Sequence, residues 1–210
     1  MGVFLAIPTE GEVRTELMIP IFQLVTSSGL DVDFRWQIDR PVDRSRTKLA
    51  EEFMDSGHED LLFVDSDTLP PDRFWEMRDI DADIISAPTP ILRSGRIAMN
   101  AYVWKSDENR YAHYQQLSHQ PGPPLEVDAV GFGCVLIRRH VFEKLAKPWF
   151  VSEDHLREDG RSEDVNFCYR AKEAGFKIVV DQTKICQHVR VVDMLDWYAE
   201  VVGLRSQVKG

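Results

Sequence analysis

The first 65 residues alternate between short apolar runs and longer segments with apolar residues at helical spacing. Strand-like runs occupy residues 3–7, 32–38 and 61–64, and helix-like stripes occupy residues 17–25 and 49–54. Gly57 is placed to end the second helix, and Pro20 either kinks the first or marks a later start. Because parallel neighbours in a sheet need long crossovers, this order predicts an α/β fold with a mostly parallel sheet flanked by helices.

The remaining sequence continues the pattern less regularly. We predict strands at 84–87, 99–104, 127–137 and 176–180, and helices at 140–145, 163–174 and 193–204. Two long loops, 118–124 and 150–162, interrupt these elements, and loops of that length are often functional. A chain of 210 residues then corresponds to a single domain, residues 1–210.

Charge and composition exclude several classes of function. The chain carries 25 basic and 35 acidic residues, for a net charge of −10, which disfavours strong nonspecific binding to nucleic acid or to an anionic membrane. No apolar stretch approaches the roughly 20 residues of a membrane span. Cys134, Cys168 and Cys186 are odd in number and widely spaced, so we predict neither disulfides nor a zinc site, and we expect a cytoplasmic protein.

Asp65, Ser66 and Asp67 follow directly after the apolar run at 61–64. If the strand persists that far, side chains two residues apart project to the same side and both carboxylates can face one ligand. Hard oxygen ligands suit Mg²⁺ or Mn²⁺, which usually also take phosphate oxygens from the substrate. The alternative is a polar strand terminus with capping aspartates.

Arg44, Arg46 and Lys48 begin the helix that leads into this strand. Cations at a helix start oppose the helix dipole, so a nearby phosphate would explain their presence. The alternative is a solvated basic face or salt bridges to Glu51 and Glu52.

Three later features also have two readings. Glu163 and Asp164 follow Ser162 and open a helix, so they are either a functional acidic pair or ordinary residues of a first helical turn. His188 follows the last predicted strand and is either a metal ligand or a structural histidine. Gly131 and Gly133 flank Phe132 in an apolar segment, where they indicate either a bulge or the close approach of a ligand.

Taken in order, these pieces resemble the nucleotide-sugar glycosyltransferases with the GT-A fold, in particular small family 2-like members. The resemblance rests on three stretches: "DRSRTKLAEEFMDSGHEDLLFVDSDTLPPDRF" at 43–74, "VDAVGFGCVLIRRHVFEKLAKPWF" at 127–150 and "SEDVNFCYRAKEAGFKIVVDQTKICQHV" at 162–189. It implies a Rossmann-like GT-A domain whose residues 1–92 bind the nucleotide sugar and whose residues 93–210 form the acceptor-side and catalytic half.

The resemblance also implies roles for individual residues. The metal ligands would be Asp65, Asp67 and His188, holding Mn²⁺ or Mg²⁺, and the catalytic pair would be Asp164 as general base with Glu163 beside it. The donor, with a UDP-sugar expected, would contact Pro8, Thr9, Glu10, Asp39, Arg44, Arg46, Asp65 and Ser66. The acceptor side would include Gly131, Phe132, Gly133 and Trp149. The acceptor itself stays open between a glycan, a lipid-linked saccharide, a protein and a modified nucleobase.

Three rival interpretations remain. A phosphatase of the haloacid dehalogenase type also places DxD after an apolar strand, with Asp65 as the nucleophile, but it expects Thr or Val at the position of Leu69. A nucleotidyltransferase expects a Gly-rich basic loop where this chain has "PTEGEV". A noncatalytic module with the same fold would bind the donor without turnover.

Overall fold

The computed structural model describes residues 2–11, 13, 15–93, 96–105, 110–113, 122–153, 161–189 and 198. Its first elements are β1 (Val3–Thr9), α1 (Thr15–Ser27), β2 (Val32–Ile38), α2 (Val42–Ser56), β3 (Asp60–Val64), β4 (Thr68–Leu69) and the 3₁₀ helix η1 (Phe74–Asp79). Then follow β5 (Ile84–Ser86), β6 (Pro90–Arg93), β7 (Arg96–Met99), β8 (Ala101–Lys105), β9 (Arg110–His113), β10 (Leu125–Glu126) and β11 (Ala129–Val130). The last are β12 (Cys134–Arg138), α3 (Arg139–Lys144), α4 (Glu163–Glu173), β13 (Ile178–Val180) and β14 (Gln187–His188).

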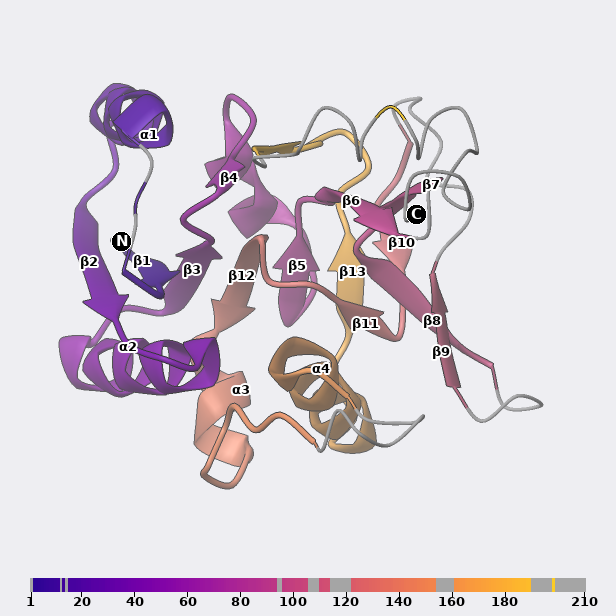
Figure 1. The fold of residues 1–210 in the computed structure, drawn as a ribbon. Coiled ribbons are helices and arrows are strands. Elements are labelled where there is room, and N and C mark those ends of the chain that lie inside the picture. Colours follow the sequence, from indigo (N-terminus) through magenta and orange to yellow (C-terminus); the bar gives the residue numbers. More distant parts are fainter. Residues whose placement is uncertain are drawn as a thin grey trace.

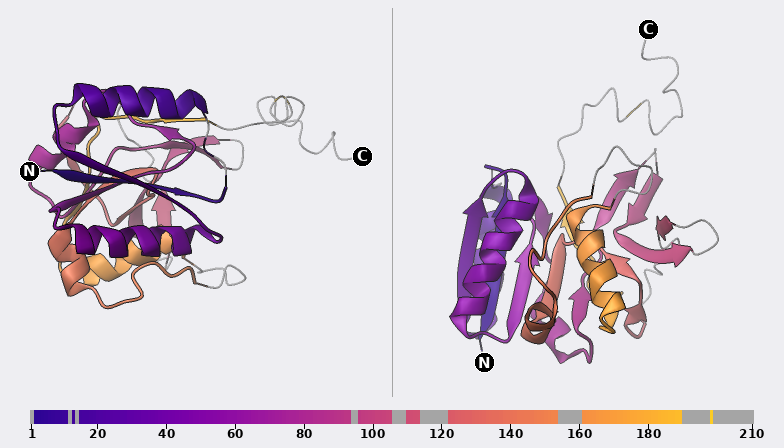
Figure 2. Two further views of the ribbon diagram at one scale, coloured as in Figure 1. Left: turned by 90° about the vertical axis from the view of Figure 1, so that its left-hand side faces the viewer. Right: turned by 90° about the horizontal axis from the view of Figure 1, so that it is seen from below.

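A seven-stranded sheet in the order β10-β13-β5-β12-β3-β1-β2 forms the centre of the molecule (Figure 1). Strands β2, β1, β3, β5 and β13 run in one direction, whereas β12 and β10 run in the other. The sheet is therefore mixed and mostly parallel, as the sequence predicts. Helix α1 covers one face, and α2, α3 and α4 lie on the other (Figure 2).

Each face of the sheet packs its own apolar core. On the α2 and α4 side, Phe4 and Phe63 pack with Phe53, Phe132 and Phe167 in a cluster of aromatic rings. On the α1 side, the core is mostly aliphatic with Phe74 as a buried ring, and β1 contributes its alternate residues there. All seven residues of β1 are buried, which is why its sequence is a continuous apolar run rather than an alternating one.

The predicted elements of the first half are confirmed with small changes of length. Gly57 ends α2 in the left-handed conformation, with φ of 76°, as its position predicts. Pro20 lies inside α1, which begins at Thr15, so the later start that we considered is wrong.

Two predicted strands of the second half are each broken in two. The segment 99–104 divides at Asn100 between β7 and β8, and 127–137 divides at Gly131 to Gly133 between β11 and β12. The halves belong to different sheets: β11 joins β8 and β9, whereas β12 lies between β3 and β5. The two breaks lie against each other, because Gly131 N donates to Asn100 O at 2.7 Å and a Cβ at Gly131 would lie 2.6 Å from Asn100 Nδ2.

Other expectations have mixed outcomes. The helix predicted at 193–204 lies outside the described residues except for Tyr198, as do parts of both predicted loops. The three cysteines are buried and free. In the described part of the chain, no helix is both long and apolar enough to cross a membrane.

Candidate functional site

A cleft of about 680 Å³ opens where β1 and β3 end and α4 begins. Its lining brings together residues that are far apart in the sequence: Pro8, Thr9, Glu10, Arg40, Val42, Arg46, Asp65, Ser66, Asp67, Ser162, Glu163 and Asp164. The carboxyl ends of parallel strands are the usual ligand site of such sheets. Nine of these twelve residues are candidates from the sequence; Arg40, Val42 and Ser162 are additions.

Arg46 lies at the buried floor of the cleft with 4% of its side chain exposed. Its Nη2 donates to Asp65 Oδ1 at 2.6 Å, its Nη1 donates to Glu163 Oε1, and its guanidinium lies over the Phe132 ring at 5.6 Å. Burial alone would lower the pKa of Arg46, but the charges of Asp65 and Glu163 outweigh it and raise the pKa. Arg46 is thus a permanent cation that joins β3 to α4.

The two acidic partners of Arg46 are themselves held in an unfavourable environment. Burial raises the pKa of Glu163, and the charge of Arg46 only partly opposes this. The pKa of Asp65 is raised for the same reason, with Asp67 adding repulsion. In the described part of the chain, Glu51 pairs with Lys147 and Glu52 with Arg35, and no salt bridge joins either of them to Arg44, Arg46 or Lys48.

Asp67 is held against His188 by a small two-stranded sheet. Strand β4 pairs with β14, and Val189 N donates to Asp67 O at 2.9 Å. His188 Nδ1 lies 2.8 Å from Pro90 O, and Nε2 lies 3.0 Å from Asp67 Oδ2. Since a carbonyl only accepts, Nδ1 carries the hydrogen, and a neutral ring would direct the Nε2 lone pair at a carboxylate. A proton on Nε2, a proton on the carboxyl group or a cation bound to both atoms would each make this contact favourable.

The turn at Asp65 to Asp67 differs from the expectation in one respect. Strand β3 ends at Val64, and Thr68 N donates to Asp65 O at 3.0 Å, so the two aspartates lie in a turn rather than on an extended strand. Both still line the cleft, but Asp65 is directed to Arg46 and Asp67 to His188. Within the described ranges, no three His, Cys, Asp or Glu side chains are grouped as a complete metal site.

Asp164 lies in the first turn of α4 at the rim of the cleft. Its Oδ1 accepts hydrogen bonds from Val165 N at 2.7 Å and from the Ser162 hydroxyl. Ser162 occupies the N-cap position, but its hydroxyl makes no capping bond to the helix backbone and binds Asp164 instead. The carboxylate is therefore fixed through one oxygen, whereas no hydrogen bond to Oδ2 is seen in the described part of the chain.

The first loop and its neighbour form the other wall of the cleft. Arg40 Nε donates to Glu10 O at 2.8 Å, and Thr9 O accepts from Asp39 N at 3.1 Å, so the ends of β1 and β2 are joined. Asp39 itself binds Lys48 Nζ at 2.7 Å and does not line the cleft; the hydrogen bond from Lys48 lowers its pKa. Arg40 was missed because it follows β2 without any helical or strand pattern.

Several predicted site residues are not brought to the cleft. Arg44 is exposed on α2 and lies outside the cleft lining. Trp149 is 4% exposed, and its Nε1 donates into the core, to Phe142 O and Leu145 O, so its placement on the acceptor side is corrected to a core position. Phe132 is likewise a core residue beneath Arg46. Gly131 and Gly133 lie against Asn100 and Thr89, whose side chains a Cβ at either glycine would meet.

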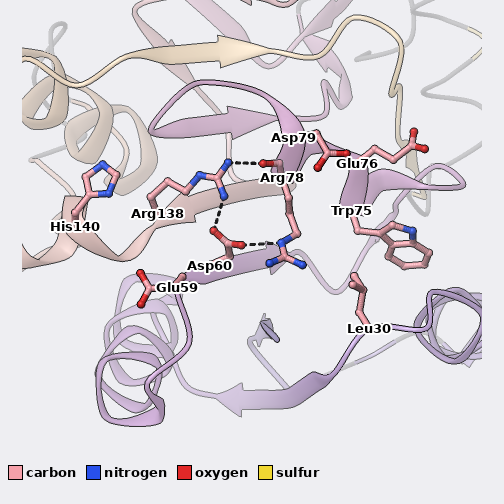
Figure 3. A pocket seen from close by; sticks show the side chains of 9 residues that line it. All are labelled: Leu30, Glu59, Asp60, Trp75, Glu76, Arg78, Asp79, Arg138 and His140. Atoms are coloured by element: carbon pink, nitrogen blue, oxygen red, sulfur yellow. Dashed lines mark hydrogen bonds and ion pairs between the residues drawn. The ribbon is translucent and has the colours of Figure 1, made fainter. Parts of the chain in front are cut away.

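A second cleft, of about 570 Å³, lies at the other end of the strands, beside the start of β3 (Figure 3). There, Asp60 accepts from Arg78 Nε at 2.7 Å and from Arg138 Nη1 at 2.6 Å. Arg138 Nη2 also donates to Arg78 O at 2.6 Å, which ties η1 to β12. These contacts form a structural clamp, and none of the candidate residues from the sequence lies there.

Comparison with known proteins identifies the fold. No family model matches the chain, and no characterised protein sequence matches it. Among solved structures, A197 from STIV superposes with a TM-score of 0.55 at 17% identity, covering 92% of this chain and 98% of that one. GalNAc-T7 with UDP, GalNAc and Mn²⁺ gives a TM-score of 0.56 at 11% identity, covering 92% of this chain and 44% of that one. The inositol-1-phosphate CTP transferase from T. maritima gives 0.52 at 12%, covering 100% and 98%.

These likenesses show the fold. The chain is a mixed α/β domain of the Rossmann-like, GT-A-like type, a fold shared by a GalNAc-T and by a nucleotidyltransferase. It spans less than half the length of the GalNAc-T7 chain.

Proposed function

We propose that the chain is a metal-dependent glycosyltransferase that moves a sugar from a nucleotide-diphosphate sugar, with a UDP-sugar as the expected donor, to an acceptor hydroxyl. The observation that carries this proposal is that one cleft brings Asp67 together with the Arg46–Glu163–Asp164 group. His188 does not line this cleft itself, but its Nε2 lies 3.0 Å from Asp67 Oδ2. The Asp67–His188 pair suits a donor diphosphate with its metal, and the Arg46–Glu163–Asp164 group suits an attacking hydroxyl. In this proposal, residues 1–92 form the donor half and residues 93–210 form the acceptor side.

The charge of the cleft supports a divalent cation. The lining includes five acidic residues, Glu10, Asp65, Asp67, Glu163 and Asp164, against two basic ones, Arg40 and Arg46. A diphosphate alone would be repelled by this excess of negative charge, whereas a diphosphate with a divalent cation would not. The side chains that line the cleft therefore fit a cation that is bound together with the substrate.

Asp67 and His188 are the residues that would hold Mn²⁺ or Mg²⁺, with Asp65 beside them. His188 already has its Nδ1 hydrogen bonded to a backbone carbonyl, the usual arrangement of a histidine whose other nitrogen binds metal. With two protein ligands, phosphate oxygens and waters would complete the shell, as is common for Mg²⁺ sites. When bound, the cation would offset the negative charge that develops on the departing nucleoside diphosphate.

The chain's own residues account for the other half of the reaction. As the acceptor oxygen forms its bond to the anomeric carbon, the bond from that carbon to the diphosphate oxygen breaks and its electron pair leaves with the diphosphate. Asp164 Oδ2 takes the proton of the acceptor hydroxyl, while Oδ1 stays fixed by Ser162 and Val165. An attack from the side opposite the leaving group inverts the anomeric centre.

Arg46 has a positioning role in this proposal. Each of its terminal nitrogens already donates to a carboxylate, so it fixes Asp65 on the donor side and Glu163 on the acceptor side. Its charge also lowers the repulsion between these acids. The ends of β1 and β2, with Thr9, Glu10 and Arg40, form the wall that would hold the nucleoside.

Product analysis tests the reaction type. The chain is incubated with Mn²⁺ and, in parallel, with UDP-glucose, UDP-galactose or UDP-N-acetylglucosamine, with CTP or UTP plus a sugar 1-phosphate, and with p-nitrophenyl phosphate. Release of UDP that EDTA abolishes supports the proposal. Release of pyrophosphate would indicate a nucleotidyltransferase, and release of phosphate would indicate the phosphatase with Asp65 as nucleophile. Donor binding without any product, both with water as the acceptor and with glycan, lipid-linked saccharide and protein acceptors added, would indicate a noncatalytic module.

A further inference from the structure

The outer edge of the sheet is formed by β2, which pairs with β1 on one side only in the described part of the chain. The left view in Figure 2 looks at this edge, with α1 on one side of the sheet and α2 on the other. Proteins usually protect such edges with short strands, prolines, bulges or charges. Strand β2 has seven residues, no proline and an unbroken register with β1 from Val32 to Ile38.

The hydrogen bonds to β1 determine which main-chain groups are left at the edge. Asp31 O accepts from Val3 N at 2.8 Å, and Asp39 N donates to Thr9 O at 3.1 Å. Because the direction of N–H and C=O alternates along a strand, the odd-numbered residues of β2 face β1. Val32, Phe34, Trp36 and Ile38 therefore direct their N–H and C=O groups away from the sheet. Phe34 O accepts from Arg35 Nη1 at 2.9 Å and Ile38 O accepts from Gln37 Nε2 at 3.1 Å, so a partner strand would replace these two side-chain hydrogen bonds.

The side chains of the edge are divided between its two faces. The even-numbered residues are apolar, and the Phe34 ring contacts Phe22 of α1 at 5.3 Å and Trp36 at 5.7 Å between centroids. Trp36 is 59% exposed, Ile38 56% and Phe22 45%, so they form an apolar stripe at the surface. On the other face, Asp33 and Arg35 form an ion pair with each other.

We propose that β2 pairs with β2 of a second copy of this chain, antiparallel and about a two-fold axis through Phe34. In this register, Phe34 lies opposite Phe34 of the second copy, and Val32 lies opposite its Trp36. Asp33 lies opposite Arg35 of the second copy, and the symmetry repeats this charge pair. The apolar stripes meet on one face of the joined sheet, and the charged residues meet on the other.

The charges select this register among the neighbouring symmetric ones. In an antiparallel ladder, residues whose N–H and C=O groups face the partner strand lie opposite one another. Because such residues alternate along β2, the two-fold axis must pass through a residue rather than between two residues. An axis through Arg35 would place Arg35 opposite its own copy, and an axis through Asp33 would do the same with Asp33. An axis through Trp36 would place Asp33 opposite Asp39. Only the axis through Phe34 brings Asp33 and Arg35 together, which is why a second copy is the occupant that the edge fits.

The pairing leaves the candidate site intact. Since the two β2 strands run in opposite directions, the two clefts lie at opposite ends of the joined sheet. Every residue that lines a cleft comes from its own copy, so the proposal is independent of the proposed activity.

Sedimentation equilibrium of the full chain tests the proposal, because the dimer has twice the mass of the 24.2 kDa chain. The single reversals D33R and R35D each place like charges opposite one another, and the double variant D33R/R35D restores opposite charges. We expect each single variant to raise the dimer dissociation constant at least about tenfold, equivalent to about 1.4 kcal/mol. The double variant should restore most of the lost affinity. Trp36→Lys should also dissociate the dimer.

The control is Ile97→Ser, which removes a 69% exposed apolar residue from β7 and should change nothing. Circular dichroism and melting temperature confirm that each variant is folded. A wild-type chain that stays monomeric at about 100 µM overturns the proposal. A dimer that the single reversals leave unchanged, or that the double variant fails to restore, overturns it as well, because another surface or register would then hold the copies together.

Discussion

Replacing Arg46 by Met is expected to be among the most destabilising single changes in the chain. The substitution keeps a side chain of similar length over Phe132 but leaves Glu163 and Asp65 without their shared cation. Breaking a buried ion pair by removing one partner costs about 3–5 kcal/mol. For a chain of about 200 residues, each kcal/mol lowers the melting temperature by about 2–4 °C, so we expect a loss of about 6–20 °C.

The size of the loss should depend on pH in a defined direction. Burial already raises the pKa of Glu163, and loss of Arg46 removes the charge that opposes this rise. When a carboxyl group has a higher pKa in the folded state than in the unfolded state, the free energy of unfolding falls as the pH rises from the unfolded pKa through the folded pKa. The difference between wild type and R46M should therefore be smaller at pH 5 than at pH 8, because Glu163 can take up a proton at the lower pH.

Urea denaturation followed by circular dichroism measures both effects. Arg44→Met is the matched control, because Arg44 lies on the same helix but is exposed; it should change the free energy of unfolding by less than about 0.5 kcal/mol. The double variant R46M/E163Q should recover part of the loss, since it removes a buried charge. If R46M costs no more than R44M, or if E163Q recovers nothing, the account of the buried charge network is wrong.

Three further predictions concern single positions. Asp164→Asn should lower the rate of transfer about 10²- to 10⁴-fold while leaving nucleotide affinity unchanged in a titration; an equal loss of both would contradict its role as base. Trp149→Phe should lower the free energy of unfolding by about 1–3 kcal/mol, because two buried carbonyls lose their donor, without changing the KM for any acceptor; a changed KM with unchanged stability would restore the acceptor-side role. Gly131→Ala should destabilise the chain by about 1–3 kcal/mol, since the new Cβ would lie 2.6 Å from Asn100 Nδ2, and an unchanged urea midpoint would refute this.

The sequence predicts the elements that depend on local pattern. Strands β1, β2 and β3 and helix α2 follow from apolar periodicity and from Gly57, because each buries a face that the pattern itself defines. The break between β11 and β12 could not be predicted in this way. Gly131 and Gly133 indicate an irregularity in this segment, but the sequence does not show that Asn100 and Thr89 are the residues that lie against them.

The same distinction holds for the site. The sequence predicts the residues that could bind the metal or the donor or act in catalysis: Arg46, Asp65, Asp67, Glu163, Asp164 and His188. Their pairings depend on tertiary structure, because Arg46 and Glu163 are 117 positions apart and His188 and Asp67 are 121 apart. Trp149 illustrates the opposite case, since an aromatic residue beside a predicted loop is indistinguishable in sequence from one that fills the core.

Nucleotide-dependent thermal stabilisation tests the central claim most directly. UDP, GDP, CMP and ADP are each added with Mn²⁺, Mg²⁺ or EDTA to the wild type, to Asp67→Asn and to the control Asp55→Asn, which alters an exposed residue of α2. A ligand at 100 times its dissociation constant stabilises by about 2.7 kcal/mol, or about 5–11 °C here. The account predicts that UDP with Mn²⁺ gives this shift in the wild type and the control, and that EDTA or Asp67→Asn abolishes it. No shift with any nucleotide, or a shift that persists with EDTA and in Asp67→Asn, would contradict it.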